Sequence, residues 1–269
     1  MIRPCLYQVL NSELSCACIY NVVTTCSIVL LQINAVDKYG ITPLHLAFQT
    51  GNDVAVEKLL EVQDIKVDIA DINGDTPLHE ACSHGEKEIV NMLIHKMKDK
   101  GSLNLQVENN LGLTPFHIAC RGGHAGIVSK LLHESQHKQS LITAYDKERA
   151  VSLHFACQSG SVSVVKLLLE TSKDEVAKLI FKQKEDGVTP VHVTAQYGHT
   201  TVMELLEKYV QFGRKDLSAT QDNYHQTPLH FAAEYGQKEI LDFLLKFMYV
   251  KVLFIYLVLD QVMNKLQGS

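Results

Sequence analysis

The stretch DTPLHEAC, residues 75–82, is the part of the sequence that decides the fold. Thr76 can cap a helix, and Pro77 fits the first helical position because its missing N–H costs nothing there. His79 and Cys82 then lie about one helical turn apart. Such a pair is either a reactive or metal-binding site or one copy of a structural module, and the rest of the chain distinguishes the two.

The same pattern occurs six times along the chain. Successive copies of its histidine are separated by 34, 38, 37, 38 and 38 residues, and a glycine always follows six residues after the histidine. An apolar run begins about ten residues after the histidine. A regular spacing of this kind indicates a repeat protein. The repeat histidines are His45, His79, His117, His154, His192 and His230.

Each copy reads as a turn, a short helix, a glycine and a longer helix. In the second copy, DING (71–74) is a tight turn. Leu78 and Ala81 share one face of the short helix, and Gly85 suits the left-handed residue that ends it. The sequence EKEIVNMLIHKM (86–97) then places apolar residues at helical spacing.

This unit resembles the ankyrin repeat, whose hallmark is a TPLH helix start with a downstream glycine. The resemblance covers roughly residues 34–246. It implies an all-α solenoid of stacked antiparallel helix pairs with β-turn fingers. The spacing exceeds the ~33 residues usual in the family, and the extra residues fall in 95–106 and 170–186. Longer second helices or extended loops on the outer face are expected there.

Two copies depart from the pattern. In the fourth copy, Arg149, Val151 and Ser152 replace the glycine, threonine and proline, so its first helix is expected to be the most weakly capped. In the sixth copy, His225 occupies the glycine position. The repeat histidine and the later glycine are present in both, so the stack is expected to continue through them.

The cysteines of the repeats are predicted to be packing residues. The slot three residues after the histidine accepts cysteine, alanine or phenylalanine, and free cysteine packs as a small hydrophobe. Zinc needs three or four ligands around one point, whereas neighbouring copies are ~8–10 Å apart, which also exceeds disulfide reach. We therefore predict no metal and no cofactor, and we expect the histidines to bond to their own threonine or to neighbouring backbone. The slot holds Phe48, Cys82, Cys120, Cys157, Ala195 and Ala233.

Composition narrows the class of protein. The net charge of −5 argues against nucleic acid as a partner. The seven cysteines are an odd number in a long chain, which favours a reducing compartment over a disulfide framework. A cytoplasmic location is therefore expected, with membrane association as the alternative.

Both ends fall outside the repeat pattern. Residues 14–31 carry no charge over 18 residues, a length close to that of a membrane span, and residues 247–259 are apolar with one lysine. We interpret 1–33 as a degenerate apolar repeat or cap, 34–246 as the ankyrin repeat domain, and 247–269 as an apolar extension. The alternative for 14–31 is a targeting or membrane role. Solenoids normally end in repeats with a polar outer face, and neither end here has one, which suggests a fragment of a longer array or ends that meet a partner or a membrane.

The sequence predicts no enzyme. It lacks the P-loop, the zinc-protease HExxH and the GxSxG motifs. The resemblance implies a scaffold or adaptor that binds a protein partner on its concave face. Two alternatives remain: the cytosolic ankyrin portion of a membrane protein such as a TRP-type channel, and a regulatory subunit of an enzyme complex.

The resemblance also indicates where a partner would bind. The positions are the two residues before each turn glycine and the two before each later glycine. Tyrosine and arginine are enriched in binding hot spots, and three such tyrosines gather in the last two copies. The alternative for each position is an ordinary solvated surface residue. The predicted partner-binding residues are Tyr39, Asn73, His84, Arg121, Gln158, Tyr197, Tyr224 and Tyr235.

Overall fold

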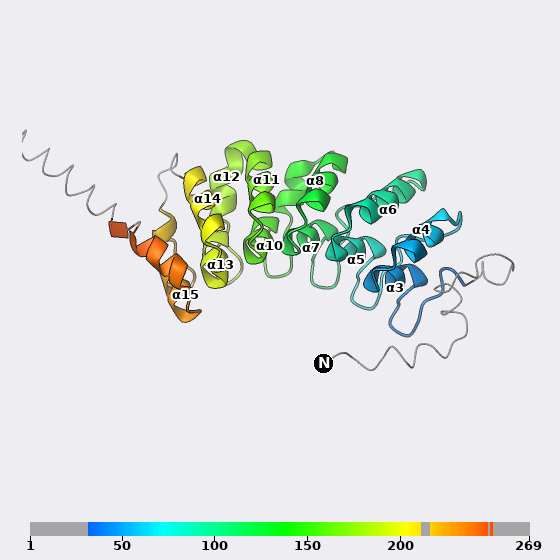
Figure 1. The fold of residues 1–269 in the computed structure, drawn as a ribbon, viewed down its shortest axis with the longest axis horizontal. Helices are drawn as coiled ribbons and strands as arrows, with labels where there is room; N and C mark the ends of the chain where they lie inside the picture. The colour runs from blue at the N-terminus through cyan, green and yellow to red at the C-terminus, as the bar shows by residue number, and fades with distance from the viewer. Residues whose placement is uncertain (1–31, 211–215, 247, 250–269) are drawn as a thin grey trace, which may run out of the picture. The chain divides into compact units, whose positions relative to one another are not determined.

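The computed structural model describes residues 32–210, 216–246 and 248–249 (Figure 1). The predictions for 1–33 and 247–269 lie outside these residues except at 32–33 and 248–249. Within the described residues the chain forms helices and turns and no strand, so the predicted all-α fold is confirmed. No helix in these ranges has the length and apolar character needed to cross a membrane.

The second repeat shows how the predicted unit folds. In the second copy, Thr76 precedes α5 (Pro77–His84), and the helix stops at Gly85, whose φ of 87° is left-handed. The longer helix α6 (Lys87–Asp99) follows and buries Leu93, at 0% exposure, in the core. A side chain at Gly85 would meet both the strained φ and a neighbouring histidine ring, which accounts for the glycine.

The chain divides into two compact units, and the first is Met1–Lys147. Its first helices pack in one layer and its second helices in another (Figure 1). A short helix, α9 (Lys138–Thr143), follows the last second helix. The first helices are α3 (Pro43–Gln49), α5 and α7 (Pro115–Arg121), and the second helices are α4 (Asp53–Glu61), α6 and α8 (Ala125–Glu134).

The second unit is Glu148–Ser269 and repeats this arrangement. Its first helices are α10 (Ser152–Ser159), α13 (Pro190–Tyr197) and α15 (Pro228–Glu234). Its second helices are α11 (Val162–Ser172), α14 (Thr200–Val210) and a helix over 238–246. Among its described residues, the short 3-10 helices η3 (Lys173–Glu175) and η4 (Leu217–Ala219) lie in the connections.

The extra residues after the second helices fold in different ways. Residues 95–106 prolong α6 as far as Asp99, which is the longer helix that was expected. Residues 170–186 form α12 (Val176–Ile180), a short separate helix that packs on α11 and α14. The expectation of a longer helix or an open loop was therefore incomplete, because buried Leu179 and Ile180 give this segment an apolar face of its own.

The fourth copy forms its first helix without the usual cap. Val151 has no hydroxyl, yet its backbone N–H still donates to His154 Nδ1 over 3.1 Å. Both Val151 and Ser152 are fully buried. Packing and the histidine contact thus replace the threonine–proline start, and α10 packs on α13 of the following repeat in the same unit.

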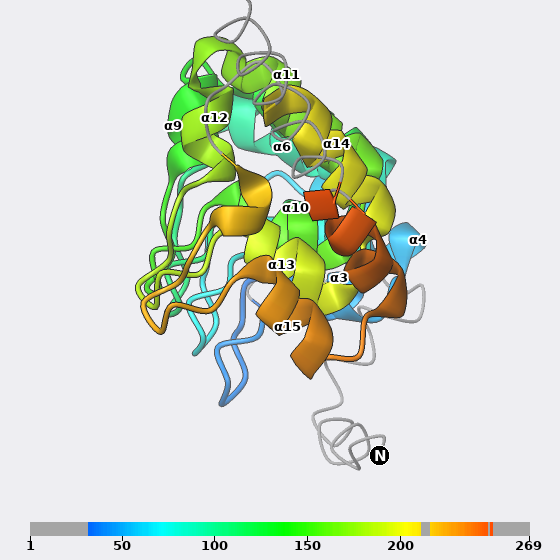
Figure 2. The same ribbon diagram turned by 90° about the vertical axis from the view of Figure 1, so that its left-hand side faces the viewer.

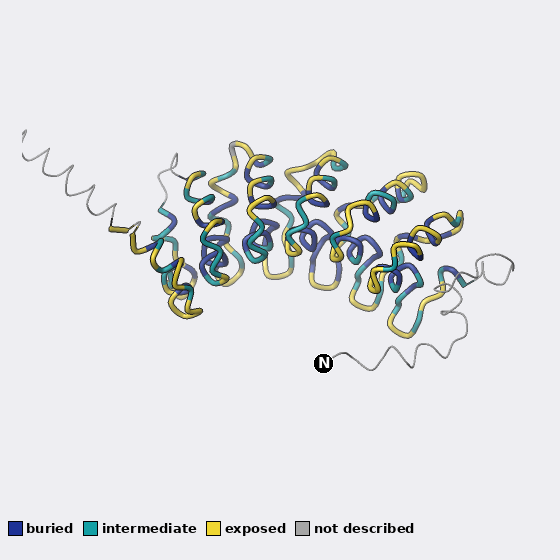
Figure 3. Tube along the Cα trace, viewed as in Figure 1, coloured by how far each residue is buried: buried dark blue, intermediate teal, exposed yellow. Residues whose placement is uncertain are grey.

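The turns in each unit are joined by backbone hydrogen bonds. In the first unit, the Ile72 amide donates to the Tyr39 carbonyl over 2.9 Å, and the Asn110 amide donates to the Asn73 carbonyl over 2.8 Å. The turns therefore project together from each unit (Figure 2). Buried residues concentrate where the helices face one another, and exposed residues lie along the turns and outer surfaces (Figure 3).

Candidate partner-binding surface

In five of the six repeat histidines, all except His230, both ring nitrogens are used within the fold. His79 Nδ1 accepts from the Thr76 amide over 3.0 Å, so that nitrogen carries no proton. Its Nε2 therefore carries the proton and donates to the Leu113 carbonyl over 3.0 Å, in the next repeat. The expected bonds to the cap threonine and to neighbouring backbone are both present. Equivalent forward bonds run from His45 to Asp75, His117 to Ala144, His154 to Val188 and His192 to Gln226.

Burial lowers the pKa of four of these imidazoles and so favours their neutral form. It lowers the pKa of His117 and of His154 to about 4, even though both rings bond to carbonyls that favour the protonated form. The pKa values of His79 and His192 are lowered for the same reason. The five buried repeat histidines therefore hold adjacent repeats together through their forward bonds.

The cysteines of the pattern are packing residues, as predicted. Cys82, Cys120 and Cys157 are all 0% exposed. Burial raises the pKa of Cys157 to about 12, and it raises the pKa values of the other two thiols well above their usual range. Among the described residues, no three metal-binding side chains cluster together.

A second series of hydrogen bonds runs backward between repeats, and the sequence did not predict it. The seventh residue after the repeat histidine donates to a carbonyl at the end of the preceding first helix. His199 Nε2 lies 3.0 Å from the backbone carbonyl oxygen of Gln158, and Gln237 Nε2 donates to the backbone carbonyl oxygen of Gln196 over 2.8 Å. In the first unit, His124 Nε2 lies 3.2 Å from the Ser83 oxygen. The only sequence signal was a long donor side chain immediately after the glycine.

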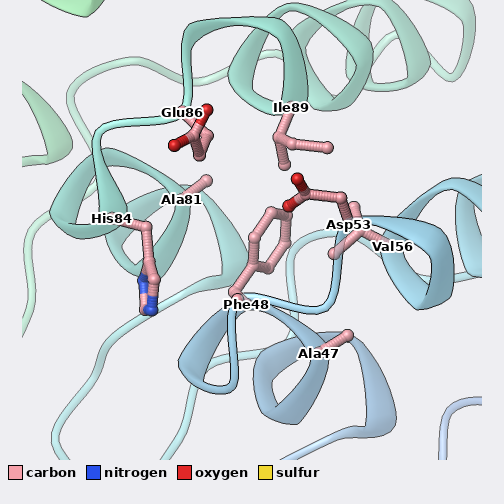
Figure 4. Close-up of a pocket in the computed structure, with 9 residues that line it drawn as sticks. Ala47, Phe48, Asp53, Val56, Ala81, His84, Glu86 and Ile89 are labelled. Carbon is pink, nitrogen blue, oxygen red and sulfur yellow. The ribbon is translucent and has the colours of Figure 1, made fainter. Parts of the chain in front are cut away.

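The backward bond is missing between the first two repeats of the first unit. Here the seventh residue is Glu86, whose carboxylate cannot donate a hydrogen bond when ionised. The backbone carbonyl of Gln49, which would be the acceptor, accepts no hydrogen bond within the described chain. A space of about 20 Å³ remains beside the Phe48 ring, with Asp53 and Glu86 at its edge (Figure 4). It has room for about one water molecule, so it does not suit a small-molecule ligand.

The predicted binding residues of the first unit are exposed and separate. Tyr39 is 37% exposed, with Lys38 Nζ 4.8 Å from its ring centre. Asn73 bonds within its own turn, and His84 bonds to Glu80 of its own helix. Arg121 ends α7. Among the described residues of this unit, no hydrogen bond or ring contact joins these four side chains.

The second unit brings two predicted residues together. Gln158 Nε2 donates to the Tyr197 hydroxyl oxygen over 2.9 Å. The Tyr197 ring also stacks on His199, with ring centres 6.3 Å apart and planes at 9°. It is nevertheless 44% exposed. Tyr224, 77% exposed at a turn tip, and Tyr235, 50% exposed after α15, make no such contact with it.

Comparisons with known proteins agree with this architecture. A family model described as ankyrin repeats in three copies matches residues 14–104, 97–178 and 153–252. The chain is 38% identical over 99 residues to SMC5-SMC6 complex localization factor protein 1 of Bos taurus, covering 35% of this chain and 9% of that protein. It is 36% identical over 64 residues to ankyrin repeat domain-containing protein 13C of Homo sapiens, covering 24% of this chain and 12% of that protein.

A third relative has a different kind of name. Over 70 residues the chain is 40% identical to tyrosine-protein kinase HTK16 of Hydra vulgaris, covering 25% of this chain and 9% of that protein. The matched region is thus about a tenth of the length of each of these relatives. The likeness concerns the repeats and does not extend to the activities of the whole proteins.

Proposed function

This chain belongs to the ankyrin-repeat family, and we propose that it is a non-catalytic scaffold that binds a protein partner. The observation that carries the proposal is the arrangement of Tyr197, Gln158 and His199. These side chains come from two adjacent repeats and fix an aromatic ring that is nearly half exposed. A ring held in place before binding loses little conformational entropy when a partner covers it.

The Tyr197 hydroxyl adds a specific polar contact. Its oxygen accepts the Gln158 amide hydrogen, which leaves the hydroxyl hydrogen available to an acceptor on the partner. The ring supplies apolar area beside this donor, the combination that enriches tyrosine at interfaces. Tyr235 and Tyr224 offer further exposed rings in the same unit. We propose Tyr39, Asn73, His84 and Arg121 as the corresponding contacts of the first unit.

The chemistry of the described residues supports a non-catalytic role. The repeat histidines that the next repeat covers use both nitrogens in the fold. The described cysteines are buried and protonated. These buried histidines and cysteines, the two residue types best suited to nucleophilic or acid–base catalysis, are thus committed to structure in the described repeats.

The test is a double variant, Tyr197→Ala with Tyr235→Ala. Affinity purification with the intact chain first identifies a partner, and binding of that purified partner is then titrated. We expect the double variant to bind about 30-fold more weakly, which corresponds to ~2 kcal/mol, with an unchanged melting temperature. Glu204→Ala, an exposed change on the outer helix α14, is the matched control and should bind normally.

Two results would reject the proposal for this face. Equal binding by the double variant and the control would place the interface elsewhere. A large drop in melting temperature would show that the rings stabilise the fold. Tyr197→Phe separates the hydroxyl from the ring, because it retains the stack on His199 and loses the bond to Gln158.

A further inference from the structure

The last described repeat exposes a surface that the other repeats bury. Its repeat histidine, His230, is exposed, whereas the other five repeat histidines are at most 3% exposed. Ala233 is exposed in a slot where the other five residues are at most 2% exposed. Leu245 is 53% exposed, and its counterparts in the first four repeats are at most 6% exposed. We call His230, Ala233 and Leu245 the forward surface.

Where another repeat of the same unit follows, the positions equivalent to the forward surface are covered by the helix pair of that next repeat. The repeat histidine then donates from Nε2 to the backbone carbonyl just before the next cap threonine. His230 keeps the first half of this arrangement, since its Nδ1 accepts from the Thr227 amide over 3.1 Å. Its Nε2 therefore carries a proton, and no acceptor lies against it in the described chain. Exposed stretches mark α15 in Figure 3.

The turns show a matching pair of unused groups. Between successive turns, the second residue of each later turn donates its amide to the third residue of the turn before, as Asn223 does to Asp186 over 3.0 Å. Tyr224, at the third position of the last described turn, has a carbonyl that receives no such bond within 32–210, 216–246 and 248–249. At the first described turn, the Lys38 amide makes no bond of this kind within the same ranges.

The first described repeat also has a carbonyl with spare capacity. The Ile41 oxygen accepts the Asp37 amide over 3.1 Å. Its counterpart, the Asp75 oxygen, accepts the equivalent Asp71 amide and also His45 Nε2 over 3.0 Å. No histidine reaches Ile41 among the described residues. A carbonyl oxygen has two lone pairs, so one remains for a histidine donor.

We propose that the forward surface of the last described repeat binds the first described repeat of a second copy of this chain. The contact continues the interface that already joins repeats within each unit. His230 Nε2 would donate to the Ile41 oxygen of the second copy, and the Lys38 amide of the second copy would donate to the Tyr224 oxygen. Ala233 and Leu245 would be covered as their counterparts are. Each of the two unused donors, His230 Nε2 and the Lys38 amide, is thus paired with the acceptor that occupies the equivalent repeat position.

The geometry of this contact predicts the form of the assembly. It joins two different surfaces, so it is heterologous, and a heterologous contact that does not close into a ring produces chains of increasing length. Sedimentation velocity of the intact chain, from about 1 to about 100 µM, should therefore show a weight-average sedimentation coefficient that rises without reaching a dimer plateau.

Substitutions on the forward surface test the proposal directly. Ala233→Arg places a long charged side chain on an exposed slot, so the circular dichroism spectrum should be unchanged while association weakens at least about tenfold. Leu245→Arg should act in the same way. Glu239→Arg is the matched control, because its position on the second helix is exposed in all six repeats, and it should associate like the unmodified chain.

The opposite end provides an independent variant. Lys38→Pro removes the unused amide at a turn position that proline favours, so it should leave the fold intact and weaken association. Ala233→Arg retains this end and should shorten the assemblies when mixed with the unmodified chain. A monomer at about 100 µM, a discrete dimer, or association that survives Ala233→Arg would each overturn the proposal.

Discussion

At the scale of single residues, a buried imidazole with both nitrogens committed makes the fold sensitive to acid. His117 Nδ1 accepts from the Thr114 amide over 3.2 Å, and Nε2 lies 3.1 Å from the Ala144 oxygen. A second proton would remove the first bond and place a charge in the core. The folded protein therefore binds protons at this histidine less readily than the unfolded chain does.

The free energy of unfolding should consequently fall as the pH is lowered from about 6.5 to about 4. The folded pKa values of His117 and His154 are about 4, below the value of 6.5 for an unperturbed histidine. Within this window the unfolded chain binds more protons, so stability is present above it and is lost as the pH falls through it. Each histidine contributes a slope of at most ~1.4 kcal/mol per pH unit. Urea unfolding at a series of pH values measures the slope.

Substitutions identify the source of this pH dependence. His117→Gln should reduce the slope, and His133→Gln, which changes a side chain that is 83% exposed, should not. Glu134 titrates in a lower window, because hydrogen bonds from Lys130 and Lys98 lower its pKa to about 2. A free energy of unfolding that is equal at pH 7 and pH 5 would contradict the assignment.

Backbone strain distinguishes two residues at the same turn position. His225 has a φ of 62°, and Gly187 has a φ of 84°. A left-handed conformation costs a non-glycine residue ~1–2 kcal/mol, so His225→Gly should raise the free energy of unfolding by ~0.5–1 kcal/mol. Gly187→Ala should lower the free energy of unfolding by ~2 kcal/mol or more, because the new Cβ would lie 2.5 Å from the backbone nitrogen of Asn223. Chemical denaturation tests the pair, and effects of the same sign would be inconsistent with this account.

For these residues, the sequence could predict the interactions that form within a single repeat. The threonine cap, the glycine stop and the burial of Cys82 follow from neighbours within one repeat. The forward bond of His79 joins it to Leu113, 34 residues away. Its acceptor becomes known only when adjacent repeats are placed against each other, so the sequence could predict a backbone partner without naming it.

At the scale of helix pairs, the backward bond depends on one variable side chain. The seventh residue after the repeat histidine is histidine or glutamine where the bond forms and glutamate at position 86. The sequence alone could not assign a role to this position, because the acceptor carbonyl belongs to the preceding repeat and its place is known only from the structure. The same limit applies to α12, whose short apolar face was visible in the sequence but whose packing on α14 was not.

Restoring the missing bond should strengthen the contact between the first two repeats. Glu86→Gln would place an amide donor beside the Gln49 oxygen, as Gln237 does for Gln196 over 2.8 Å. The expected gain is ~0.5–1.5 kcal/mol, the net value of a typical hydrogen bond. Glu57→Gln, an exposed change on α4, removes the same charge without adding the bond and is the control. Equal urea midpoints for the two variants would show that the backward bond does not stabilise the pair.

At the scale of the whole molecule, a repeat protein is stabilised by its own helices and by contacts with its neighbours in the stack. The second unit shows the consequence clearly. Helix α13 packs between α10 and α15, so both of its faces are covered. Helix α15 packs on α13, and its other face carries the exposed His230 and Ala233. Of the partner-binding tyrosines that we propose, Tyr197 is the last residue of α13 and Tyr235 directly follows α15. The two tyrosines therefore lie on helices of unequal stability.

Hydrogen exchange should reveal this inequality. Backbone amides of α15 and of 238–246 should exchange through local opening, at a lower free energy than the amides of α13, because opening the last pair breaks one set of neighbour contacts where opening α13 breaks two. Exchange followed by mass spectrometry at low protein concentration compares the two helices within one sample. Leu206→Ala, which truncates a fully buried side chain of α14, should cost ~2–5 kcal/mol and reduce the protection of α13. If α15 were as protected as α13, its outer face would have to be covered in the free chain. That result would remove both the basis for a weak last repeat and the surface available to a second copy.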